Sequence, residues 1–297
     1  ANTYLRDLTK SKYAGDSVTS REWYRPYPAS GMVNWSARNN TNYMQAGVLA
    51  SLTYAADNRE GLLKNFYQKG MNNTQFAEKN KVKQFTISAT QRDPSMAAYL
   101  VNQLRAQGIE VHRVQQGEGA GSYLVKLDQP YSKLAYDLLT EQQYPKEAKF
   151  PPYDAIAWTL SMLYGVEVEK NESFTHDDAD LSLVIEEVRY EGKVVGEASN
   201  YVLDYAGQSK VLSALYALKQ YGKNVKALTS DTPLIIENDT LATGSIVFQG
   251  LTAAQAAKLA SDFELDLKAA SDISSELRAV TVPKVAVFHS WTDTQAE

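Results

Sequence analysis

The sequence predicts an α/β fold built from two related strand-helix-strand-strand-helix units that form mixed sheets, preceded by a helical bridge segment. Two observations predict it. Between residues 85 and 139, strand-like and helix-like apolar patterns follow one another in this order. The same order recurs from residue 201 to about residue 265, with Gly121 and Gly244 at matching strand starts. A duplicated fold unit explains this recurrence, although two copies do not make a solenoid.

The composition excludes several classes of protein. With 297 residues the chain can hold two domains, or one large one, around a sizeable core. Its formal net charge of −5 argues against binding to nucleic acid, which requires a basic face. No apolar run approaches the ~20 residues that a membrane span needs. Because the chain has no cysteine, disulfides, thiolate nucleophiles and cysteine-based metal sites are excluded.

The first 80 residues are predicted to form the bridge. Residues 1–40 are polar, and the proline- and aromatic-rich stretch 20–28 suits an extended or irregular connector. From Thr41 the pattern becomes helical, with one apolar stripe made of Met44, Val48, Leu49 and Leu52. A second helix is expected to stop at Gly70, and the polar stretch 71–83 is interpreted as a linker and domain boundary.

In the first unit, strands are predicted at residues 85–89, 109–114 and 122–127, and helices at residues 94–107 and 130–139. Asp93 is the predicted N-cap of the first helix, with Pro94 at the first helical position and Gly108 closing it. The glycine-rich loop 117–121 precedes a strand, whereas a phosphate-binding loop opens a helix. We therefore expect it to be a flexible hairpin loop.

The second unit has predicted strands at residues 201–205, 224–228 and 244–249, with helices at about 209–221 and from Thr252 onward. Gln255 is placed to complete a capping box with Thr252. Further predictions are a helix from Asp154 to residue 163 ended by Gly165, a hairpin turn at 191–193 and a strand at 283–290. The expected domains are a tail or bridge (1–80), a first α/β unit (81–170) and a second unit (171–297), truncated at its C-terminus.

No catalytic pattern is present, and no catalytic residue is expected. The three histidines, His112, His176 and His289, stand in neither a His-x-x-Glu nor a His-Glu-x-x-His sequence, which zinc peptidases use to bind metal. Glu186 and Glu187 are expected on opposite faces of a strand, where they cannot act as an acid–base pair. The acidic loop 175–180 lacks the glycine and distal glutamate of an EF-hand, so a solvated loop is expected.

Three residues are candidate ligand contacts: Arg92, Asp93 and His289. Arg92 and Asp93 follow a strand and enter a helix, a position at which α/β folds bind small ligands. The alternative is a helix cap beside a surface charge. His289 ends a predicted strand before a turn, which is a similar position. His112 alternates along its strand and is expected to be partly exposed or hydrogen-bonded.

An ordered series of stretches carries a family resemblance. Its members are residues 20–26 (Ser-Arg-Glu-Trp-Tyr-Arg-Pro), 35–40, 47–54 (Gly-Val-Leu-Ala-Ser-Leu-Thr-Tyr), 91–94 (Gln-Arg-Asp-Pro), 108–113, 121–130, 152–160 and 287–291 (Val-Phe-His-Ser-Trp). Together they resemble the region downstream of the catalytic core in large bacterial M14-family zinc carboxypeptidase-like proteins. In that family the zinc ligands and the catalytic glutamate lie upstream of the aromatic stretch, so none of them maps onto this chain.

The resemblance implies an accessory segment of a larger, secreted or periplasmic bacterial protein. Residues 1 to about 75 would be the tail of the upstream peptidase domain of the same polypeptide, or the bridge from it. Zinc is expected in the parent protein and not in this segment, and a peptide is a possible substrate. The rest would be similar to a class I glutamine amidotransferase-like fold, although the cysteine nucleophile of that activity is absent here.

Two further hypotheses remain open beside the accessory segment. The first is a small-ligand or peptide- or glycan-binding α/β module with no peptidase role, suggested by the 19 tyrosines and by the strand-end residues Arg92, Asp93 and His289. The second is a structural domain that mediates oligomerisation.

Overall fold

The computed structural model describes residues 3–10, 12–13, 16–17, 32–148, 157–205, 207–236 and 239–286. The chain divides into two compact units. The first consists of residues 1–72 and 143–156, and the second of residues 73–142 and 157–297. The expected connector at 20–28 and the candidate ligand residue His289 lie outside the described residues.

The first unit is formed by short strands and long helices. Strand β1 (Tyr4–Asp7) pairs antiparallel with β4 (Met32–Trp35), and β2 (Lys12–Tyr13) pairs with β3 (Asp16–Ser17). A 3₁₀ turn, η1 (Leu8–Lys10), follows β1. Helix α1 (Ala37–Asp57) begins after Ser36, whose N–H donates to Asn39 Oδ1 at 2.9 Å, and ends at Asn58.

The prediction that the second helix stops at Gly70 is wrong, because helix α2 continues past this residue. It spans Arg59–Thr74, and a short helix α3 (Phe76–Lys79) follows where a linker was predicted. A glycine inside a helix costs only about 1 kcal/mol relative to alanine, which neighbouring turns can offset. Here Gln68 and Asn72 form a side-chain hydrogen bond of 2.9 Å across this glycine, as residues four apart on a helix do.

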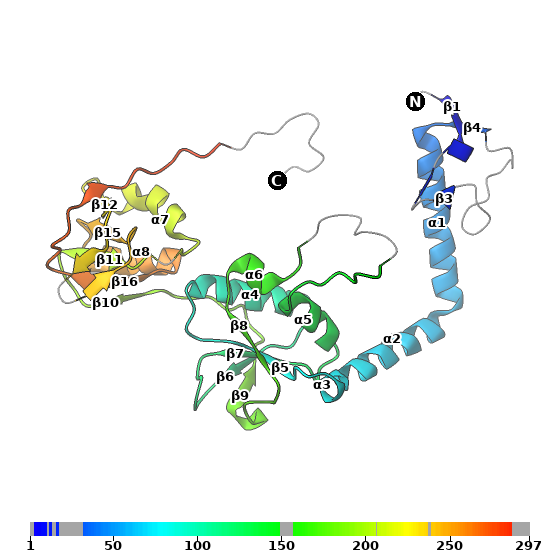
Figure 1. Cartoon of the computed structure of the whole chain (residues 1–297), viewed down its shortest axis with the longest axis horizontal. Coiled ribbons are helices and arrows are strands. Elements are labelled where there is room, and N and C mark those ends of the chain that lie inside the picture. Colours follow the sequence, from blue (N-terminus) through cyan, green and yellow to red (C-terminus); the bar gives the residue numbers. More distant parts are fainter. Residues whose placement is uncertain are drawn as a thin grey trace. The chain divides into compact units, whose positions relative to one another are not determined.

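The second unit contains two lobes, each with its own sheet. The sheet of the first lobe has the order β8-β5-β7-β6-β9 and is antiparallel throughout. Its strands are β5 (Gln84–Ile87), β6 (His112–Val114), β7 (Tyr123–Lys126), β8 (Val168–Asn171) and β9 (Leu181–Leu183). Helices α4 (Pro94–Ala106), α5 (Ser132–Leu139) and α6 (Leu160–Tyr164) lie on one face of this sheet (Figure 1).

Alternation along the strands explains why that face is the core. Phe85 and Ile87 on β5 are fully buried against Leu100 and Leu104 of α4. The intervening residue Thr86 faces the other side, where its hydroxyl donates to Asn171 Oδ1 at 2.6 Å. Period-two alternation therefore sets which side chains reach the helices, as the sequence predicted.

The sheet of the second lobe has the order β10-β16-β11-β15-β12-β17. Its strands are β10 (Lys193–Val195), β11 (Asn200–Leu203), β12 (Lys226–Thr229), β15 (Ile246–Gln249), β16 (Asp266–Ala270) and β17 (Arg278–Ala279). The pairing is antiparallel except between β10 and β16, so this sheet is mixed. A hairpin, β13 (Leu234–Ile236) and β14 (Asp239–Leu241), lies between β12 and β15.

The helices of the second lobe pack on its sheet through a buried cluster that includes Tyr201, Phe248 and Leu259. They are α7 (Val211–Ala217), the 3₁₀ turn η3 (Leu218–Tyr221) and α8 (Ala253–Phe263). The predicted capping box opens α8. The N–H of Thr252 donates to Gln255 Oε1 at 2.8 Å, and the N–H of Gln255 donates to Thr252 Oγ1 at 3.3 Å.

Both lobes share one topology. Each runs strand-helix-strand-strand-helix-strand, with its four strands arranged fourth, first, third, second across the sheet. This is the ferredoxin-like split β-α-β arrangement. The α/β prediction with two related units is therefore confirmed, and each unit gains a fourth strand, β8 or β16. Because a glutamine amidotransferase-like fold is built on parallel strands, this antiparallel pairing gives no support to that part of the resemblance.

Three local predictions differ from the structure. Residues 191–193 do not form a hairpin, because Lys193 opens β10, which runs parallel to β16. Residues 283–286 form no strand, and the last strand within the described residues is the short β17. Helix α6 begins at Leu160 after Thr159, although it ends as predicted at Gly165, which has a φ of 62°. Across the described ranges, no helix has both the length and the apolar character needed to cross a bilayer.

Candidate functional site

The predicted corner at Arg92 and Asp93 joins the two lobes of the second unit. Asp93 Oδ1 accepts hydrogen bonds from the N–H groups of Ser95 (3.1 Å) and Met96 (3.3 Å). This is the predicted N-cap of α4. Asp93 Oδ2 accepts a further bond from the N–H of Ser209 in the second lobe at 2.6 Å.

The hydrogen bonds of Asp93 favour its charged form. Burial alone would raise the pKa of this carboxyl group, but the bonds from Ser209, Ser95 and Met96 outweigh that effect and hold the pKa below its ordinary value. The guanidinium of Arg92 lies beside Gly165 and Gly207. The corner is therefore a packed junction in which Asp93 is almost fully buried, and not an open ligand site.

His112 is half-buried on the face of the sheet away from the helices. Its Nδ1 is buried and has no hydrogen-bond partner among the described residues. Burial holds the pKa of His112 below its ordinary value. A cavity of about 290 Å³ adjoins it, lined by charged side chains that include Lys126 and Asp178, which form an ion pair at 2.8 Å.

The acidic loop is tied to the first sheet. Besides the pair between Asp178 and Lys126, Asp180 Oδ1 accepts from Gln116 at 2.7 Å, and His176 Nε2 contacts the carbonyl oxygen of Glu118 at 2.8 Å. Within the described ranges, no three histidine, aspartate or glutamate side chains converge in a way that could hold a metal ion. The carboxylates of Asp178 and Asp180 are therefore bound to Lys126 and Gln116.

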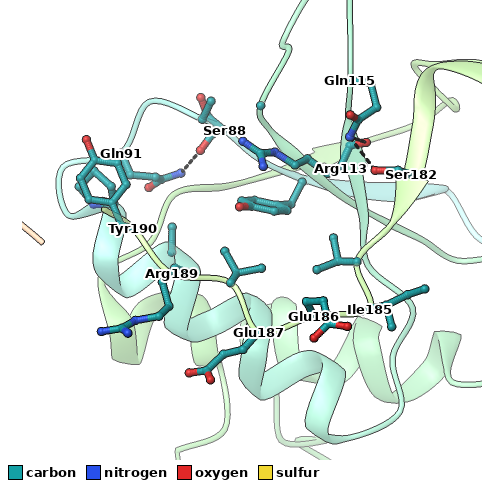
Figure 2. A pocket seen from close by; sticks show the side chains of 18 of the residues that line it. Ser88, Gln91, Arg113, Gln115, Ser182, Ile185, Glu186, Glu187, Arg189 and Tyr190 are labelled. Carbon is teal, nitrogen blue, oxygen red and sulfur yellow. Dashed lines mark hydrogen bonds between the residues drawn. The ribbon is translucent and has the colours of Figure 1, made fainter. Parts of the chain in front are cut away.

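A groove of about 570 Å³ lies in the first lobe, and the exposed side chain of Arg113 lines it. Helix α4 and the strands β6 and β7 form two of its walls, and residues 184–190, called the strap here, form the third. Figure 2 shows Arg113 reaching from β6 toward Ser88, with Glu186 and Glu187 on the strap at the opposite side.

The strap is held in place by side chains of α4. Asn102 binds both main-chain groups of Val188, donating to its carbonyl oxygen at 2.7 Å and accepting from its N–H at 2.9 Å. Arg105 Nε donates to the carbonyl oxygen of Val184 at 2.8 Å, and Nη2 of the same side chain donates to Ile185. At the far end, the Tyr190 hydroxyl donates to Asp266 in the second lobe at 2.6 Å.

Comparison with known protein families, curated proteins and solved structures gave no match. The functional argument therefore rests on the residues and their geometry.

Arg113 has an unusual position for a charged side chain. It follows the fully buried Val111 by two residues and so points to the same, helix-facing side of the sheet, yet Arg113 itself is exposed. Its guanidinium carbon lies 6.0 Å from the centroid of the Tyr123 ring. In the part of the chain that the structure describes, no carboxylate lies within ion-pair distance of it.

Tyr123 forms part of the groove floor. Burial raises the pKa of its hydroxyl, and the nearby Arg113 charge opposes that effect only in part. The remaining floor is apolar, made of Ala97 and Ala98 on α4. Glu186 and Glu187 were expected on a strand, but the strap is not a strand, and both side chains line the groove. The arrangement can bind a small ligand but presents no nucleophile paired with a base.

Sequence reasoning did not single out Arg113 or the strap. A signal for Arg113 was present, because a charged residue two positions after a core valine occupies an inward-facing position of the strand. No such signal marks the strap. Asn102 and Arg105 are ordinary polar residues of a helix, and their partners lie about 80 residues later in the chain.

Proposed function

We propose that this chain is an accessory, non-catalytic segment of a bacterial M14-like zinc metallocarboxypeptidase that acts on peptides. The parent protein would be secreted or periplasmic. The proposal rests on one observation: residues that carry the family resemblance also form an exposed apolar surface. The family-like stretch 47–54 contains Val48, Leu49 and Leu52 of the apolar stripe on α1, and that stripe is uncovered.

The stripe has the character of a contact surface. Met44 is 72% exposed, Leu49 64% and Leu52 63%, and α1 buries none of its residues. Helix α2 also buries none, and Leu63 and Phe66 are 68% and 70% exposed. Soluble proteins rarely leave contiguous apolar patches of this kind open unless another body covers them. The resemblance supplies the occupant, the upstream peptidase domain of the same polypeptide.

The zinc chemistry belongs, in this proposal, to that upstream domain. The described residues of this chain offer no side-chain set that fits a zinc ion, and no step of peptide hydrolysis is assigned to them. The contribution of this chain would be to pack against the peptidase domain and to present its lobes beside the site of reaction.

The test is association of the chain with the peptidase domain encoded upstream, measured by sedimentation. The double variant Leu49→Gln/Leu52→Gln should weaken association by about tenfold or more, because each substitution removes apolar surface area from the contact. Ala50→Gln, on the opposite side of α1, is the matched control and should leave association unchanged. Equal binding by all three proteins, or stoichiometric zinc with carboxypeptidase turnover in this chain alone, would contradict the proposal.

A second candidate is a small-ligand or peptide- or glycan-binding module with no peptidase role. The specific observation in its favour is the groove under the strap, where the exposed Arg113 guanidinium has no carboxylate within ion-pair distance among the described residues. A thermal-shift panel of short peptides and peptidoglycan fragments tests it. Stabilisation by any member supports this candidate, and no stabilisation across the panel argues against it.

A further inference from the structure

We infer that the groove under the strap binds a small monocarboxylate with an apolar group, such as an N-acylated amino acid or a short peptide, through Arg113. The inference rests on the second candidate function, because it names the ligand class of that groove. It does not depend on a relationship to metallopeptidases.

The size of the groove sets the first limit on the ligand. A volume of about 570 Å³ lies within the roughly 300–1,000 Å³ range typical of small-molecule sites. One wall is the strap, whose main chain is fixed to Asn102 and Arg105. Because those bonds occupy its polar groups at Val184 and Val188, the strap offers a defined wall and not a loose loop.

The charge of Arg113 sets the second limit. A guanidinium presents a planar fork of donors that matches a carboxylate with two parallel hydrogen bonds. Here the side chain is exposed, and its guanidinium carbon lies 6.0 Å from the centroid of the Tyr123 ring. This ring contact holds the guanidinium over the groove without using its hydrogen-bond donors.

The strap sets the third limit. Glu186 and Glu187 place two negative charges on the wall opposite Arg113 (Figure 2). Arg189, on the same strap, lies 4.0 Å from the carboxylate of Glu264 in the second lobe, which offsets its positive charge. A phosphate or other multiply charged anion would be repelled by Glu186 and Glu187, whereas a monocarboxylate places its single charge at the Arg113 end. The floor formed by Ala97 and Ala98 is apolar and has no polar side-chain atom, so it accepts an aliphatic group.

The probe pair is N-acetyl-leucine and N-acetyl-leucinamide, which differ in the carboxylate alone. Binding to the full chain is followed by two-dimensional NMR. We expect the acid to shift the signals of Ala97, Ala98 and Tyr123, and the amide to bind about tenfold or more weakly, since it loses a charge-assisted hydrogen-bond pair. Inorganic phosphate should not displace the acid.

Variants of Arg113 test how much the guanidinium contributes to binding, apart from the rest of the groove. Arg113→Gln should weaken binding of the acid by about tenfold or more and leave the amide unchanged, while Arg113→Lys should be intermediate. Arg59→Gln, on α2, is the matched control for loss of one positive charge. Because Arg113 is exposed, its variants should unfold at the wild-type temperature, which verifies that the fold is intact.

Three results would overturn the inference. Equal binding of acid and amide, unaltered binding by Arg113→Gln, or displacement by phosphate would each show that the carboxylate is not recognised there. If the peptide and glycan panel binds in the groove but these carboxylates do not, the ligand class is wrong and the binding function stands. If nothing binds in the groove, both fail, and the proposed contact between α1 and a peptidase domain is unaffected.

Discussion

The variants Asp93→Asn and Asp93→Ala separate the helix cap of α4 from the bond to Ser209. One carboxylate oxygen caps the helix through Ser95 and Met96, and the other accepts from the N–H of Ser209. Asparagine is as good an N-cap as aspartate, but its amide group places a donor where Ser209 requires an acceptor. Alanine removes both interactions.

The expected losses follow from these contacts. An N-cap contributes about 1 kcal/mol to stability, and a hydrogen bond to a charged acceptor about 1.5–3 kcal/mol. Asp93→Asn should therefore lower the free energy of unfolding by about 1.5–3 kcal/mol, and Asp93→Ala by roughly 2–4 kcal/mol. Urea unfolding measures both losses, with the exposed Asp137→Asn as the control. The Ser209 amide signal should move in both Asp93 variants and not in the control.

The pH dependence gives an independent check on Asp93. Its pKa in the folded protein lies below the ordinary value, so the unfolded chain binds a proton first as the solution is acidified. Its contribution to stability is thus complete above the ordinary carboxyl pKa and is lost as the pH falls through the folded value. Asp93→Asn should lose this acid-dependent component. If Asp93→Asn matches the wild type in both stability and acid slope, the bond to Ser209 does not stabilise the junction.

Three further predictions concern other positions. Because burial lowers the pKa of His112, stability should fall as the pH drops below its ordinary value of about 6.5, and His112→Leu should remove that slope in urea unfolding measured at several pH values. Gly192→Ala should destabilise the second lobe strongly, because Gly192 has a φ of 52° and an added Cβ would lie 2.3 Å from a backbone oxygen. Gly47→Ala in α1 should instead raise helix stability by about 0.5–1 kcal/mol, and calorimetry tests both changes. Thr252→Ala should cost about 1 kcal/mol through loss of the cap of α8, and a loss below ~0.3 kcal/mol would contradict the role of that cap.

Local structure could be predicted from the sequence where it depends on residues that are close together in the chain. Asp93 before Pro94, and Thr252 three residues before Gln255, identify helix starts because a cap and its partner are adjacent in the chain. The alternating strands were predictable for the same reason. The order of strands in each sheet was not, since it depends on pairings such as that of β5 with β8, whose residues lie more than 80 positions apart.

The candidate site was harder to predict because it depends on contacts between distant segments. Arg92 and Asp93 were found as polar residues at a strand end, but the structure makes them a junction with Ser209. The groove arises only when the strap crosses α4. The residues that fix it, Asn102 and Arg105, have no local pattern that distinguishes them from surface residues.

The additional strands β9, β10 and β17 bear on how the lobes avoid aggregation. A bare sheet of this topology ends in its second and fourth strands, and such edges can pair with another chain. In the described structure β9 covers β6, β17 covers β12 and β10 covers β16. The edges of the two sheets are therefore β9, β10 and β17, which are only two or three residues long, and β8, whose two central residues are Glu169 and Lys170. Charges on an edge strand oppose pairing with a second molecule, so the sheets carry protection against edge-to-edge association.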